Sequence, residues 1–201
     1  MKVRLLVGVL VGAVSVSQAV EFTPYVGVGG GVASIQTESG VRFDPGGVIE
    51  GAGGVGITGG IPIRTELAGS YQWNNISIVD GDWENGKLTS GVLMANLYFD
   101  IMDFSANYTY ESGDLEFVPY FFGGIGAAFY DISGAGVDDD DVAFAANLGA
   151  GFGWYLTGNL VLDAKYKYAF GQDMEVEVPD SGEVKVNTAA HQVQVGLRYM
   201  F

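Results

Sequence analysis

The sequence predicts an all-β fold, an eight-stranded antiparallel up-and-down transmembrane β-barrel that follows an N-terminal signal peptide. Three observations predict it. Apolar residues alternate with polar or glycine residues at a period of two in eight separate stretches. The links between these stretches differ regularly in length, and the last stretch ends in an aromatic residue, Phe201.

Residues 1–19 have the pattern of a secretory signal peptide. Lys2 and Arg4 form a basic start, an apolar stretch follows, and Ala19 is a small residue suited to a signal-peptidase site. The apolar stretch is shorter than the roughly 20 residues that a membrane-spanning helix needs. A buried N-terminal helix is the alternative interpretation. We expect cleavage after residue 19 and a barrel domain over residues 20–201.

The eight alternating stretches are the expected strands. In the last one Val193, Val195 and Leu197 fall on one face, whereas Gln194 and Arg198 fall on the other. One face is large and apolar, and the other combines glycine with isolated charges. This alternation fits a barrel with lipid outside and a narrow polar lumen inside. The expected strands are 22–35, 47–59, 62–73, 88–101, 117–130, 142–156, 159–170 and 190–201.

The connections give a second, independent signal. Bacterial outer-membrane barrels have short periplasmic turns and long extracellular loops. Short links occur around residues 59–62 and 157–159, and the segment 102–116 is a longer link on the same, periplasmic side, with an unassigned role. The long links, expected to be extracellular, are 36–46, 74–87, 131–141 and 171–189.

Composition excludes several classes of function. The formal net charge is −15, so the chain lacks the basic surface that nucleic acid binding needs. Cysteine is absent and histidine occurs once, which excludes disulfides, thiol catalysis and sites with several histidine ligands. Glycine supplies 32 of 201 residues, and inward-facing glycines suit a barrel with little room around its axis. No cofactor is expected.

The signal peptide, the strand count and the terminal aromatic residue together resemble the small outer-membrane barrels of the OmpA-like and opacity-type surface antigen family. Residues 24–29 (PYVGVG) and 119–126 (PYFFGGIG) resemble the strand openings of that family. The resemblance covers residues 20–201 and implies a location in the bacterial outer membrane. It also implies that Tyr199 and Phe201 form an assembly signal. The implied partners are outer-membrane lipid, lipopolysaccharide and the barrel assembly machinery.

Eight charged residues are predicted to face the lumen. Arg64 opens one strand and Asp100 closes the next, so both should lie near the periplasmic end, and Asp163 and Arg198 hold similar heights. Buried charges are tolerated when they are paired. We expect a cross-linked polar plug, similar to the interior charge network of OmpA. A hydrated lumen that merely tolerates these charges is the alternative. The set is Glu50, Arg64, Glu66, Asp100, Asp163, Lys165, Lys167 and Arg198.

A run of four aspartates falls in the third expected extracellular loop. Clustered carboxylate oxygens suit a divalent cation such as Ca²⁺, but the spacing is not that of an EF-hand loop. A solvated charge run is the alternative interpretation. The run consists of Asp138, Asp139, Asp140 and Asp141.

The single histidine, His191, is expected at the outer rim among aromatic residues. The lipid A deacylase family pairs a histidine with a serine two residues further along the strand, and here that residue is Val193. We therefore do not expect an enzyme. Candidates for the aromatic belt at the lipid interfaces are Tyr71, Trp73, Trp154, Tyr166, Tyr168 and Tyr199.

Three functions follow from these expectations. The first is a structural or surface-interaction barrel, whose acidic extracellular loops meet divalent cations or molecules of a host or phage, around a narrow, charge-plugged lumen. The second is a small channel or transporter for small or apolar molecules, as in the OmpW-like family. The third is a lipid-modifying envelope enzyme. The residues do not identify a ligand.

Overall fold

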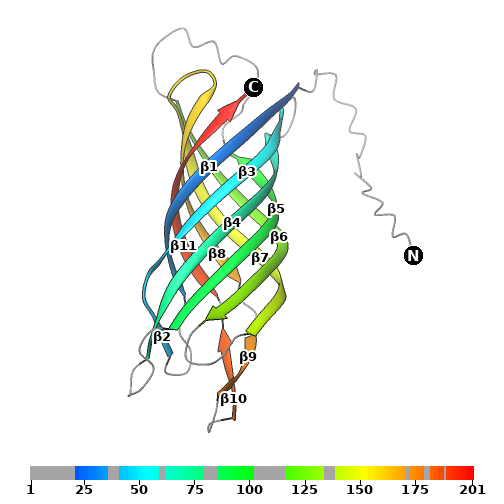
Figure 1. Ribbon diagram of the computed structural model, residues 1–201. Helices are drawn as coiled ribbons and strands as arrows, with labels where there is room; N and C mark the ends of the chain where they lie inside the picture. Colours follow the sequence, from blue (N-terminus) through cyan, green and yellow to red (C-terminus); the bar gives the residue numbers. More distant parts are fainter. Residues whose placement is uncertain are drawn as a thin grey trace, which may run out of the picture.

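Eight long strands pair in antiparallel fashion and close into a barrel (Figure 1). Each strand pairs with the next in the ring, and pairing of the first strand with the last completes the closure. The predicted eight-stranded fold is therefore confirmed. The barrel strands are β1 (Glu21–Ile35), β3 (Gly46–Thr58), β4 (Ile63–Ile78), β5 (Gly86–Asp100), β6 (Glu116–Ser133), β7 (Asp139–Tyr155), β8 (Leu160–Phe170) and β11 (Ala190–Met200).

This computed structural model describes residues 21–35, 41–58, 62–78, 86–101, 116–133, 139–170, 173–178, 182–187 and 189–201. The expected signal peptide and most of the segment 102–116 lie outside the described residues. Among the described residues, no helix is long and apolar enough to span a membrane.

Three short strands accompany the eight long ones. β2 (Val41–Phe43) pairs with the far end of β4. β9 (Asp173–Val178) and β10 (Gly182–Asn187) pair with each other as a hairpin. The hairpin projects from the end of the barrel opposite to the C-terminus (Figure 1). The predicted loop 171–189 thus contains regular structure, because its residues alternate as strands do.

Several strands extend further than predicted, and this changes the position of the aspartate run. β4 continues to Ile78, and β7 begins at Asp139. Backbone pairing continues beyond the apolar alternation, because a strand can extend while a neighbouring strand offers partners. The prediction of an aspartate loop is wrong for three of its four members. Asp139, Asp140 and Asp141 lie on β7 in register with β6, and Asp138 is outside the described residues.

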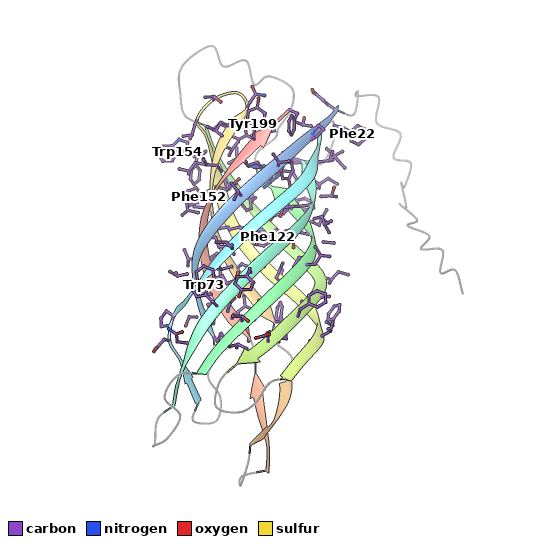
Figure 2. All side chains as sticks on the ribbon, viewed as in Figure 1. Phe22, Trp73, Phe122, Phe152, Trp154 and Tyr199 are labelled. Atoms are coloured by element: carbon purple, nitrogen blue, oxygen red, sulfur yellow. The ribbon has the colours of Figure 1, made fainter. Side chains whose placement is uncertain are left out.

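The two faces of the wall differ as the sequence predicts. On β11, Val193 and Leu197 are 54% and 45% exposed, whereas Gln194 and Arg198 are 1% and 4% exposed. Aromatic side chains project from the wall near both ends, with Trp154 and Tyr199 near one end and Trp73 nearer the other (Figure 2). The apolar outer face suits lipid, and the aromatic residues suit the two interfaces.

Inward-facing glycines make room for aromatic rings inside the barrel. A Cβ atom at Gly151 would lie 2.7 Å from the hydroxyl of Tyr120, and one at Gly149 would overlap the ring of Phe122. Both rings are buried. Glycine is needed at these positions because the rings of Tyr120 and Phe122 and the neighbouring backbone occupy the space that a side chain would fill.

Candidate functional site: the barrel interior

The eight predicted charged residues all line the interior, where we call them the lumen network. They come from strands that are far apart in the sequence, and Glu50, Arg64, Asp100, Lys167 and Arg198 are buried. Strand alternation places each of them inward because its two neighbours face outward. The network has four acids and four bases, so its formal charges cancel.

Arg64 and Asp100 form a two-point ion pair between β4 and β5. Arg64 Nε lies 2.9 Å from Asp100 Oδ2, and Arg64 Nη2 lies 3.0 Å from Oδ1. The guanidinium also lies 4.5 Å from the ring centre of Tyr98 and 4.9 Å from that of Tyr120. This arginine is therefore held by both charge pairing and cation–π contact.

Arg198 and Asp163 form a second ion pair, between β11 and β8. Arg198 Nε donates to Asp163 Oδ2 at 2.9 Å, and Nη2 donates to Oδ1 at 3.3 Å. The Arg198 guanidinium lies 5.4 Å from the ring centre of Tyr25. Asp163 and Arg198, which the sequence placed at similar heights along their strands, are therefore paired in the structure.

Glu50 on β3 contacts two lysines of β8 across the lumen. Its carboxylate accepts a hydrogen bond from Lys167 Nζ at 2.7 Å and a second from Lys165. Glu66 is held by neutral donors instead. It accepts from the Tyr98 hydroxyl at 2.7 Å and the Tyr25 hydroxyl at 3.1 Å. These contacts span the lumen from wall to wall.

An amide ladder, which was not expected from the sequence, continues the interior toward the end of the barrel from which β9 and β10 project (Figure 1). Gln194 donates to Gln192 at 2.8 Å, Gln192 to Gln72 at 2.7 Å, and Gln72 to Asn74 at 2.7 Å. Asn74 then donates to the backbone oxygens of residues 33 and 44. The signal was present in the sequence, as amides at alternate inward positions. The pairing depends on register, which the sequence does not specify.

Interior aromatic rings form a further layer that was not expected from the sequence. The rings of Tyr98 and Phe122 stack with centres 4.9 Å apart, and those of Tyr98 and Tyr120 meet edge to face at 5.5 Å. All three side chains are buried. They fill the cross-section beside Arg64.

Buried apolar clusters lie near both ends of the interior. Near the end that carries the C-terminus, Val118, Tyr155 and Val161 are buried together, and Met200 packs against them. At the opposite end the cluster consists of Ile35, Leu88 and Ala190, with Tyr130 and Ala169. Most of the buried polar residues thus lie between two apolar clusters.

The other candidate residues lie away from the lumen. His191 Nδ1 is 2.6 Å from the Tyr166 hydroxyl, and its ring centre is 5.0 Å from that of Tyr168, in an aromatic cluster on the outward face. Phe201 is 69% exposed, and its backbone N–H donates to the Pro24 oxygen at 3.0 Å. In the described part of the chain, no cluster of three His, Asp or Glu residues could hold a metal ion.

Comparisons with known proteins agree with this architecture. The family described as outer membrane protein beta-barrel domain matches residues 5–201. Neisserial surface protein A is similar in structure, with a TM-score of 0.56, 17% identity, and coverage of 92% of this chain and 100% of that one. OprG from Pseudomonas aeruginosa has a TM-score of 0.52 and 14% identity, and covers 92% of this chain and 97% of its own. A search of curated protein sequences found no match.

Proposed function

The chain belongs to the outer membrane protein β-barrel family and resides in the bacterial outer membrane, and on this premise we propose that it is a structural and surface-interaction barrel with a lumen closed to solutes. The observation that carries the proposal is the filled interior. An ion pair joins Glu50 of β3 to Lys167 of β8 across the lumen, and buried apolar clusters lie near both ends. An eight-stranded barrel encloses only enough room for side chains, and these side chains occupy it.

Conductance across a planar lipid bilayer tests the closed lumen. The refolded chain without residues 1–19 is expected to give no steady ionic current above the background of protein-free bilayers. Arg64→Ala is expected to raise ion leakage, because it removes one partner of the pair with Asp100. Lys185→Ala, on the hairpin outside the barrel wall, is the matched control and is expected to leave the current at background.

A steady, large conductance of the unmodified chain would refute the proposal and favour the small channel. Passage of small apolar molecules through the wall, measured as uptake into vesicles, would favour the transporter instead. The continuous pairing of neighbouring strands supports a wall without such an opening.

The proposed interacting surface is the extracellular end, which the acidic residues of the chain dominate. The expected extracellular links 36–46, 74–87, 131–141 and 171–189 contain 15 acidic and 3 basic residues, which gives them a net charge of −12. A surface of that sign concentrates divalent cations within about 8 Å at physiological salt. We propose that cations and host or phage molecules are met there, while the outer wall contacts lipid and lipopolysaccharide.

We propose no enzymatic activity. The nitrogen His191 Nδ1 is engaged with Tyr166, and Val193 stands where the deacylase pattern needs a serine. Tyr199 and Phe201 remain our proposed assembly signal, because they close the last strand with exposed aromatic rings.

A further inference from the structure

The hairpin of β9 and β10 projects from the end of the barrel opposite to the C-terminus (Figure 1). Its strands form a separate two-stranded sheet, and among the described strands they pair only with each other. Each of the two strands therefore has one edge along which its backbone groups pair with no other described strand. A two-stranded hairpin is only marginally stable in water, whereas three strands with an apolar face form a stable sheet. The hairpin is thus open to extension by one more strand.

The register divides the hairpin into an apolar face and a charged face. Residues that pair across the two strands share a face, and successive residues alternate between faces. One face is apolar at every position except one glycine, and the other is charged at every position except one asparagine. The apolar face holds Met174, Val176, Val178, Val184 and Val186 with Gly182, and the charged face holds Asp173, Glu175, Glu177, Glu183 and Lys185 with Asn187.

The two strands differ in charge along this face. On β9 every charged position is acidic, and Asp173, Glu175 and Glu177 recur at every second residue. On β10 the face holds one acid, Glu183, and one base, Lys185. Opposite charges on adjacent strands stabilise their pairing, and like charges destabilise it. The free edge of β9 therefore favours a strand that has basic residues at alternate positions and apolar residues between them.

A second copy of this chain does not fit the edge of β9. Its own β9 would bring three acids beside three acids, and its β10 offers a single base, Lys185. The expected extracellular links of each copy also carry a net charge of −12, so two copies repel each other at this end. Charges on an edge strand prevent unwanted pairing. Here they exclude acidic strands and admit basic ones.

We propose that the free edge of β9 is a docking site for a strand of another protein in which basic residues alternate with apolar ones. The partner strand pairs with the backbone of β9, brings its basic residues to the charged face and extends the apolar face with its other residues. The 6 residues of β9 set the length of the paired segment. This inference rests on the proposed surface-interaction function and names the chemistry of the partner.

Binding of a capped peptide in which three lysines alternate with three valines tests the docking site. The refolded barrel without residues 1–19 is placed in nanodiscs of zwitterionic lipid, and NMR titration measures binding, with protein-free nanodiscs as the blank. The peptide is expected to bind and to slow amide hydrogen exchange in β9 more than in β10. An isomer with its three lysines before its three valines has the same charge but no alternation, and is expected to bind about tenfold more weakly.

Glu177→Gln and Glu183→Gln are the matched variants. The two residues are register partners, so each variant removes one member of the same like-charged pair, and only the strand that loses the charge differs. Glu177→Gln is expected to weaken binding of the alternating peptide about threefold, because it removes one of the three acids of β9. Glu183→Gln is expected to leave the binding unchanged.

Three results would overturn the docking site: no binding of the alternating peptide, equal binding of the isomer, or equal loss of binding in the two variants. Each of them leaves the bilayer conductance at background. Failure of the proposed closed barrel would be seen instead as a steady current, so the two failures are distinguishable.

Discussion

Arg64 depends on two kinds of neighbour inside the barrel, and each can be removed separately. Asp100 neutralises its charge, and the rings of Tyr98 and Tyr120 cover its faces. A buried guanidinium without its carboxylate would remain desolvated and uncompensated. The stability of the barrel is therefore expected to depend on the pair as a unit.

Replacing one partner should cost more than replacing both. Asp100→Ala is expected to lower the free energy of unfolding by about 3–5 kcal/mol, because it leaves Arg64 as an unpaired buried charge. The double variant Asp100→Ala with Arg64→Met should recover a large part of that loss. Urea unfolding of the barrel in lipid vesicles measures both. Additive losses in the double variant would contradict the coupling.

The glycines of β7 support a prediction about packing. Gly149→Ala should destabilise the barrel by about 1–3 kcal/mol, because its methyl group would overlap the buried ring of Phe122. Gly91→Ala is the matched control, since an added Cβ there meets nothing within 4 Å. Its stability is expected to stay within about 0.5 kcal/mol of the unmodified chain. Equal midpoints for the two variants in urea would refute the packing cause of the glycine content.

At the scale of the element, period-two alternation predicted the strands and the inward charges because lipid and lumen act on opposite faces of every strand. It did not predict where strands end. β4 reaches Ile78 and β7 begins at Asp139, since backbone pairing does not require an apolar neighbour. The alternation also could not predict which side chains meet across the lumen. Glu50 and Lys165 come from strands that do not pair, so their meeting depends on how the closed barrel is twisted.

The last strand carries a prediction about assembly. Deletion of Phe201 should reduce the amount of folded barrel in the outer membrane far more than Leu162→Ala does. The deletion removes the terminal aromatic residue, whereas Leu162→Ala only shortens an apolar side chain on β8. Heat-modifiable migration of membrane fractions on gels measures the folded amount. Equal yields of the two variants would remove the support for an assembly signal at this residue.

At the scale of the whole molecule, the separation of charges predicts a response to divalent cations. The lumen network is neutral and the remainder carries −15, so repulsion is concentrated outside the lumen. Millimolar Ca²⁺ or Mg²⁺ should raise the melting temperature slightly and with little selectivity, by screening and bridging acidic residues. The control is NaCl at equal ionic strength. A divalent effect no larger than that of NaCl would contradict the prediction.

The pairing of β1 with β11 has a consequence for the order of events during biogenesis. The two strands that complete the ring come from opposite ends of the chain, as the register of Val26 with Tyr199 shows. Until β11 has been synthesised, β1 and β8 each keep one row of backbone groups without a partner. In lipid each such group costs several kcal/mol. A chain that lacks β11 therefore cannot close the ring, and stable insertion into lipid requires both ends of the chain.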